Sequence, residues 1–154
     1  MIKVMIVDDM PIFREYLREA IDWAHYGFEI CCEAKNGKEA LDLLEVYDPD
    51  IVLSDITMPF IDGLELSEFL KDKYQNTEVV LITGNSEFEY AKKAVKLGVA
   101  DYIVKPFEKE ELLTMSDNHI ECSETGTLLI RNIAMAFDAY MKKHNNKKTF
   151  SKTV

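Results

Sequence analysis

The sequence has few cysteines, no long apolar run and a shortage of basic residues. Its three cysteines show no metal-ligand spacing, and the adjacent pair Cys31 and Cys32 lies in an apolar stretch, which favours reduced thiols packed as small apolar side chains. No apolar run approaches the roughly 18 residues of a membrane-spanning helix. Met1 leads directly into a strand pattern, so we expect no signal peptide, a cytoplasmic location and no membrane partner.

The shortage of basic residues also bears on nucleic-acid partners. The formal net charge of the 154 residues is −10 at pH 7, which disfavours non-specific attraction to nucleic acid or to anionic membranes. The charge is uneven, because residues 139–154 contain five lysines and no acid. We therefore do not expect this chain alone to bind DNA.

Strand and helix patterns alternate over the first 113 residues. Strands are expected at about 2–8, 28–33, 51–55, 78–83 and 101–104. Helices are expected from Pro11, after the N-caps Asn36, Asp62 and Ser86, and from near Glu108. Five such units predict an α/β fold: a doubly wound, five-stranded parallel sheet with helices on both faces.

Apolar periodicity predicts which side of each helix is buried. The first helix is expected to bury Phe13, Leu17, Ala20, Ile21 and Ala24. The fourth helix is expected to bury Phe88, Ala91, Ala94 and Val95.

The alternation stops beyond Leu113. We divide the chain into a domain at 1–115, a linker at 116–126, and an amphipathic helix with a basic tail at 127–154. The helix repeats apolar residues at Leu129, Ile133, Phe137 and Tyr140. This stripe must be buried against the domain, against a second copy or against something missing, and the sequence leaves all three open.

Four of the strand patterns lead into reactive polar residues. Asp8 and Asp9 follow the first strand, and Asp55, Thr83 and Lys105 follow or end the third, fourth and fifth. The carboxyl ends of parallel strands share one edge, where ligands bind. Crowded acids there repel one another unless a divalent cation with oxygen ligands lies among them. The pattern predicts a magnesium-type site beside an aspartate and a lysine, which suits phosphoryl chemistry.

These motifs resemble a known signature. VDD near the start, DIxMPxxDG around Asp55, a threonine after the fourth strand and YIVKP resemble the response-regulator receiver domain over residues 2 to about 113. The resemblance implies a flavodoxin-like sheet with strand order 2-1-3-4-5. It also implies a receiver in a two-component phosphorelay whose partner is a sensor histidine kinase, with no enzymatic activity beyond self-phosphorylation and self-dephosphorylation.

The resemblance also implies a metal site around the phosphoacceptor. Asp55 would accept the phosphoryl group, Asp9 would bind Mg²⁺ directly, and Asp8 would assist through a bound water. Asp55 itself and the backbone carbonyl of Thr57 would be further ligands. Met10 departs from the family pattern, which often has an acidic or polar residue there, and a thioether binds a hard cation poorly.

Further roles follow from the same resemblance. Lys105 and Thr83 would bind the phosphoryl oxygens, Tyr102 would be the aromatic switch, and Lys105–Pro106 would be a cis peptide bond. Phosphorylation would change the surface of the fourth helix, fifth strand and fifth helix. A homodimer could form there or through the C-terminal helix. The bland alternatives, such as Asp8 and Asp9 as helix caps and Lys105 as a solvated charge, require several coincidences at one sheet edge.

A finer resemblance suggests a second function. IDWAHYGFEI and GNSEFEYAKKAVKLGVADYIVKP resemble receivers of regulators that end in an AraC-type DNA-binding domain, and AFDAYMKKHNNKKTFSKTV is faintly similar to that domain's first helix. The alternative is therefore a truncated AraC-type transcriptional regulator, and the tail helix is either its remnant or an unrelated cap on the sheet. A haloacid-dehalogenase-type hydrolase is set aside, because Thr57 stands where its second aspartate is needed.

Overall fold

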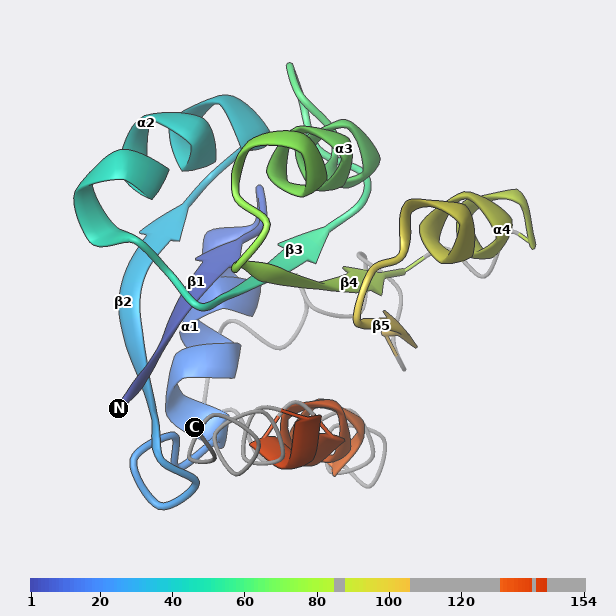
Figure 1. The fold of residues 1–154 in the computed structure, drawn as a ribbon. Coiled ribbons are helices and arrows are strands. Elements are labelled where there is room, and N and C mark those ends of the chain that lie inside the picture. The colour runs from blue at the N-terminus through green and yellow to red at the C-terminus, as the bar shows by residue number, and fades with distance from the viewer. Residues whose placement is uncertain (85–87, 106–130, 140, 144–154) are drawn as a thin grey trace, which may run out of the picture.

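The computed structural model describes residues 1–84, 88–105, 131–139 and 141–143, which build one sheet with helices around it (Figure 1). The strands are β1 (Ile2–Val7), β2 (Phe28–Ala34), β3 (Ile51–Asp55), β4 (Glu78–Thr83) and β5 (Asp101–Val104). The helices are α1 (Pro11–Ala20), α2 (Gly37–Tyr47), α3 (Gly63–Lys73) and α4 (Phe88–Leu97), and residues 131–139 and 141–143 are also helical and are called the C-terminal helix. No helix in these ranges is long and apolar enough to cross a bilayer.

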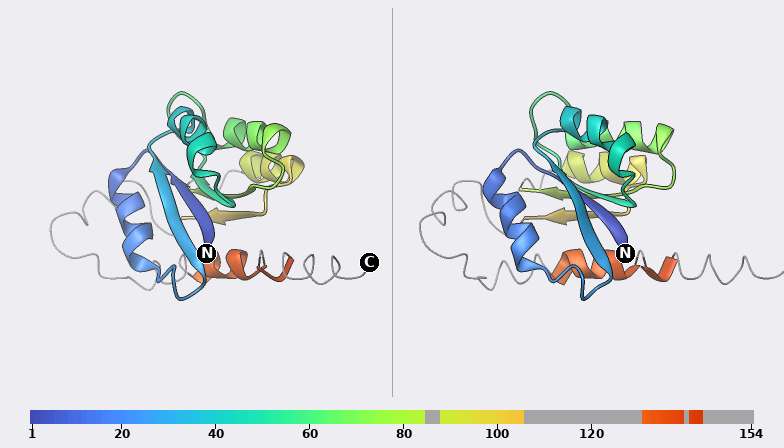
Figure 2. Two further views of the ribbon diagram at one scale, coloured as in Figure 1. Left: turned by 60° about the vertical axis from the view of Figure 1, so that its left-hand side comes forward. Right: turned by 90° about the vertical axis from the view of Figure 1, so that its left-hand side faces the viewer.

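The sheet is parallel throughout and its strands lie in the order β2-β1-β3-β4-β5, which confirms the expected order. Helices α2, α3 and α4 cover one face, while α1 and the C-terminal helix cover the other (Figures 1 and 2). Alternate residues of β1 point to opposite faces, so Val4 and Ile6 join the core under α1 while Met5 and Val7 join the other. The predicted two-sided α/β fold is confirmed.

Local hydrogen bonds explain where the helices begin. The side chain of Asn36 accepts a bond from the N–H of Glu39 (2.8 Å) at the start of α2. Asp62 and Glu65 form a reciprocal capping box at the start of α3. Both predicted caps are confirmed, whereas Ser86 and the helix expected from Glu108 fall outside the described residues.

Helix α1 is shorter than predicted, and the prediction for Ala24 is wrong. Ile21 leaves the helix in an extended conformation, and the indole of Trp23 folds back to donate to the carbonyl of Leu17 (3.0 Å). Because the indole satisfies a carbonyl at the helix end, Trp23 takes the buried position and Ala24 is exposed.

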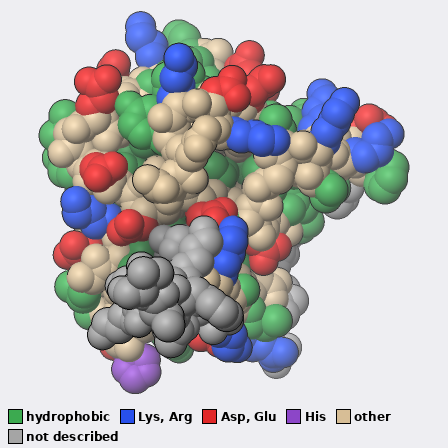
Figure 3. Space-filling view, in the orientation of Figure 1, with side chains coloured by type: hydrophobic (Ala, Val, Ile, Leu, Met, Phe, Trp, Pro, Cys, Tyr) green, Lys and Arg blue, Asp and Glu red, His purple; other side chains and the backbone are tan. Residues whose placement is uncertain are grey.

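The predicted buried side of α4 is only partly right. Ala94 is fully buried and Ala91 is half-buried, but Phe88 and Val95 are 73% and 79% exposed. Helix α4 lies beside α3 at the β5 end of the sheet, where Ala94 belongs to the core and Tyr90 and Leu97 pack against it partly buried (Figure 1). Hydrophobic side chains and lysines lie next to each other on its outer surface (Figure 3).

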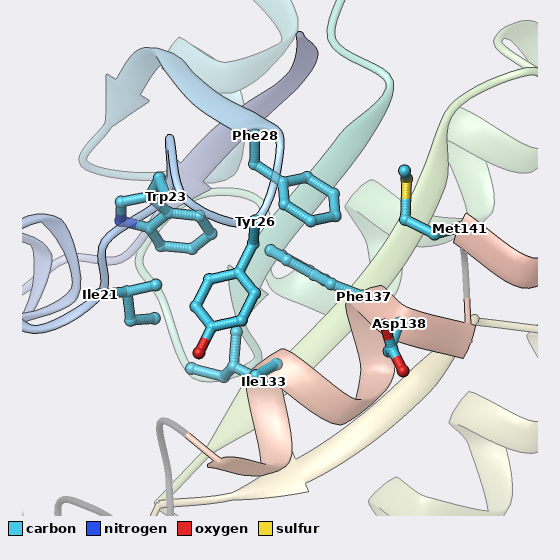
Figure 4. Close-up of a pocket in the computed structure, with 9 residues that line it drawn as sticks. Ile21, Trp23, Tyr26, Phe28, Ile133, Phe137, Asp138 and Met141 are labelled. Atoms are coloured by element: carbon cyan, nitrogen blue, oxygen red, sulfur yellow. The ribbon is translucent and has the colours of Figure 1, made fainter.

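The C-terminal helix buries its apolar stripe against the domain. Ile133 and Phe137 are 0% and 3% exposed and belong to the same core as α1. The centre of the Phe137 ring lies 4.7 Å from the centre of the Phe28 ring and 5.5 Å from that of the Trp23 ring (Figure 4). Of the three partners that the sequence left open, the structure therefore shows the domain itself. Leu129, Tyr140 and the linker at 116–126 lie outside the described residues.

Candidate functional site

The carboxyl edge of the sheet gathers the predicted polar residues. Asp8 and Asp9 directly follow β1, Asp55 and Thr83 end β3 and β4, and Lys105 directly follows β5. Carboxylate oxygens of Asp8, Asp9 and Asp55 all lie within 4.8 Å of one another. This closeness follows from the order of the parallel strands, in which β1 pairs with β3 and β3 with β4.

Lys105 is held inside this group of acids. Its Nζ lies 2.8 Å from Oδ2 of Asp8 and 3.4 Å from Oδ1 of Asp55, and only 6% of the side chain is exposed. The ammonium also lies 4.1 Å from the centre of the Phe13 ring, a cation–π contact. The alternative interpretation, in which Lys105 is a solvated surface charge without a role in the site, is therefore wrong.

Asp8 is fixed by groups on α1 and on the turn before it. Its Oδ1 accepts a hydrogen bond from the N–H of Met10 (2.8 Å), and its carbonyl accepts one from Nη1 of Arg14 (2.7 Å). The N-cap residue of α1 is Met10, so Asp8 does not occupy the capping position. Asp8 instead holds its other oxygen toward Lys105.

Asp55 is largely buried at the end of β3. Its side chain is 8% exposed. Burial raises the pKa of this carboxyl to about 6; Lys105 opposes the rise and Asp8 adds to it. Asp55 is therefore mostly ionised at neutral pH, with weak solvation and a raised basicity, which are useful properties in a nucleophile.

The loop between β3 and α3 needs a glycine to position Asp55. The N–H of Gly63 donates to the carbonyl of Ile56 (2.9 Å), which brings the start of α3 against the end of β3. A Cβ at Gly63 would overlap the carbonyl oxygen of Asp55 and lie 2.9 Å from Cα of Ile56. The glycine of the DIxMPxxDG motif therefore permits this close approach of two backbones.

The remaining predicted residues lie around this centre. Thr83 is fully buried at the end of β4, and Tyr102 is half-buried in β5 against the core that also contains residues of α4. Thr57 is exposed in the bend two residues after Asp55. The predicted cis bond involves Pro106, which lies outside the described residues. The individual roles assigned to these residues stay predictions.

The acidic group suits a small, hard divalent cation. Mg²⁺ binds oxygen at about 2.0–2.1 Å in an octahedron, so oxygens on opposite sides of one ion are about 4.2 Å apart. The separations of up to 4.8 Å therefore exceed that span by only about half an ångström. Three carboxylates face one ammonium, and a dication would offset the remaining negative charge. Met10 contributes its backbone N–H to Asp8 rather than a ligand atom.

Two residues beside the centre were missed as site residues. Phe13 was expected only as core, and Arg14 was not singled out. Both lie in the first turn of α1, immediately after the acidic pair, and they contact Lys105 and the Asp8 carbonyl respectively. Their proximity to Asp8 and Asp9 in the sequence was the available signal.

Comparisons with known proteins agree with this geometry. A family model described as the response regulator receiver domain matches residues 4–117. The chemotaxis protein CheY of Halobacterium salinarum is 40% identical over 111 residues, covering 72% of this chain and 90% of CheY. This chain spans less than half the length of other matching relatives, among them transcriptional regulatory proteins.

Solved structures give the same result. The REC domain of AraT, a response regulator from Geobacillus stearothermophilus, superposes with a TM-score of 0.63 at 41% identity, over 73% of this chain and 88% of that one. CheY in the CheX–CheY–BeF₃–Mg²⁺ complex from Borrelia burgdorferi superposes with a TM-score of 0.62 at 29% identity, over 75% and 87%.

Proposed function

The chain belongs to the response regulator receiver domain family of two-component systems, and from that premise we propose that it accepts a phosphoryl group on Asp55 in a Mg²⁺-dependent reaction. The observation that carries the proposal is the position of Lys105, whose ammonium lies within 3.4 Å of Asp55 while a second acid, Asp8, holds it in place. The donor would be a phosphohistidine of a sensor histidine kinase or a small phosphodonor.

In the proposed reaction a phosphoryl group moves from an oxygen or nitrogen atom of the donor to a carboxylate oxygen of Asp55. An oxygen of Asp55 forms a bond to phosphorus as the bond to the donor's leaving atom breaks. Negative charge spreads over the phosphoryl oxygens during transfer. Lys105 faces that charge, and its burial strengthens the interaction. Bound Mg²⁺ would neutralise phosphoryl oxygens and orient them, and Asp8, Asp9, Asp55 and the Thr57 carbonyl would hold it.

In the proposed reaction the chain is the acceptor of the phosphoryl group. Asp55 is consumed by the transfer and recovered only by hydrolysis, so we infer self-phosphorylation and self-dephosphorylation and no turnover of a separate substrate. The Borrelia complex supports the role of the cation, because it contains Mg²⁺ together with BeF₃.

The conformational change that follows phosphorylation would pass from the site through β4 and β5. A phosphoryl group on Asp55 would attract the hydroxyl of Thr83 and the ammonium of Lys105. Tyr102, between that edge and α4, would turn inward as Thr83 moves. The output surface would then be α4 and β5 with the helix predicted from Glu108, where Phe88 and Val95 are already exposed. A homodimer through this surface remains part of the proposal.

Phosphate-affinity gel analysis with acetyl phosphate tests the proposal. We expect a shifted band for the wild-type chain with Mg²⁺, and none with EDTA or for Asp55→Asn. Asp42→Asn, which changes an exposed acid on α2, is the matched control and should shift like wild type. Equal labelling of wild type and Asp55→Asn would end the assignment.

The alternative of a truncated DNA-binding regulator gains no support from the described residues. The segment similar to the first helix of an AraC-type domain packs Phe137 into the receiver core instead of standing apart as a separate module.

A further inference from the structure

Strand β2 contains one residue more than its partner strand. In the parallel ladder Val4 pairs with Ile30 and the next residue, Met5, pairs with Cys32. Cys31 therefore has no counterpart in β1 and forms a β-bulge. Bulges re-aim side chains, and they are rare between parallel strands.

The bulge changes the face to which β2 points its side chains. Phe28 and Ile30 belong to the core under α1, whereas Cys32 and Ala34 belong to the core on the opposite face. In a regular strand these four residues would share one face, and neighbouring side chains would point apart. The extra residue, Cys31, removes that separation, and its Sγ lies 3.7 Å from Sγ of Cys32.

Both thiols are positioned where a small molecule can reach them. β2 is an edge strand of the sheet, and both cysteines are half-buried and free. The Cys31 thiol donates to the carbonyl of Val4 (3.4 Å). Burial raises the pKa of both thiols, that of Cys32 to about 12, with Cys31 and Glu33 adding to the rise. The pair is therefore a protonated dithiol at neutral pH, which resists oxidants that attack thiolates.

The spacing suits one atom bonded to both sulfurs. Two bonds of about 2.3 Å at a tetrahedral angle, as at a zinc thiolate centre, place the sulfurs about 3.8 Å apart. A structural zinc site needs four protein ligands. Within the described ranges, however, the only group of three or more potential ligands is Asp8, Asp9 and Asp55. The pair therefore suits an atom that needs two thiols and carries its own further substituent.

We propose that Cys31 and Cys32 form a dithiol site for thiophilic trivalent metalloid compounds, of which organic arsenicals R–As=O are the class that binds two thiols and carries its own further substituent. Two As–S bonds form and the bonds from arsenic to oxygen break. Both thiol protons leave with that oxygen as one water molecule, so no oxidant or reductant is required. The site shares no residue with the Asp55 centre and does not depend on the proposed phosphorylation.

The test uses phenylarsine oxide on the full chain in a thiol-free reductant. We expect intact-mass analysis to show one phenylarsenic group per chain with loss of two thiol hydrogens, and an adduct that survives excess monothiol but not a dithiol. Cys31→Ser and Cys32→Ser should each lose that resistance, and Cys122→Ser is the matched control that should keep it. Cys32→Ala provides a second variant in case serine disturbs the core that Cys32 contacts.

A second experiment tests whether the folded structure strengthens the binding of phenylarsine oxide. The wild-type chain unfolded in guanidinium chloride has the same adjacent cysteines without the bulge. We expect the folded chain to bind at least about tenfold more tightly, because the thiols are already held together. Equal affinity of the two states, resistance to monothiol in either single-cysteine variant, or loss of resistance in Cys122→Ser would each overturn the proposal.

Discussion

Replacing Phe137 by alanine tests whether the C-terminal helix is a structural part of the domain. The side chain is 3% exposed and packs on the rings of Phe28 and Trp23. Removing a buried phenylalanine ring usually costs about 3 to 5 kcal/mol. The whole free energy of unfolding of a small domain is about 5 to 15 kcal/mol. We therefore expect Phe137→Ala to lose a large share of the stability of the chain.

The single tryptophan makes this loss measurable. Trp23 is the only tryptophan in the chain, it is 7% exposed, and its ring lies 5.5 Å from that of Phe137. Guanidinium unfolding followed by tryptophan fluorescence and by circular dichroism should show both transitions moving together to lower denaturant. The native emission should also shift to longer wavelength, because water gains access to the indole.

The same helix provides a matched control. Met135 is 61% exposed, so Met135→Ala should change the free energy of unfolding by no more than about 0.5 kcal/mol. A loss below about 1 kcal/mol for Phe137→Ala, with unchanged native emission, would refute the reasoning. It would mean that the helix lies on the sheet without stabilising it.

Two further predictions concern the site. Gly63→Ala should lower the free energy of unfolding by about 2 kcal/mol or more, because the added Cβ overlaps backbone atoms. The same change should slow the labelling of Asp55. Urea unfolding and phosphate-affinity gels measure the two effects, and wild-type values in both would contradict the prediction. In EDTA, ionisation of Asp55 should cost stability, since its folded pKa of about 6 exceeds the value near 3.9 of an unfolded chain. The free energy of unfolding of the wild type should fall by on the order of 3 kcal/mol relative to that of Asp55→Asn as pH rises from about 4 to above 6. Melting curves of both proteins across pH check this, and parallel curves would contradict it.

Local patterns were enough to predict most of the elements. The caps Asn36 and Asp62 depend on hydrogen bonds within one turn, so sequence spacing identifies them. The meeting of the acids and Lys105 follows from a rule about parallel strands and does not require knowledge of side-chain packing. The strand order is different, because apolar runs do not say which strands are neighbours, and only the family resemblance predicted it.

Errors arose where burial depends on what lies opposite. Periodicity predicted a stripe on α4, but α4 lies at the β5 end of the sheet and leaves Phe88 and Val95 exposed. Periodicity likewise extended α1 to Ala24, although the indole of Trp23 ends the helix by bonding to a carbonyl. The bulge at Cys31 is a property of the β1–β2 pair, so no pattern within β2 alone could predict it.

The position of the C-terminal helix also limits where a signal can leave the domain. The sequence predicted an apolar stripe around Phe137 but not its partner, and the structure places that stripe on the α1 face. That face is thereby covered, whereas α4 on the other face presents Phe88 and Val95 to solvent beside Lys92. Tyr102 belongs to the core on the α4 side, so a change at Thr83 and Lys105 would reach the uncovered surface rather than the covered one.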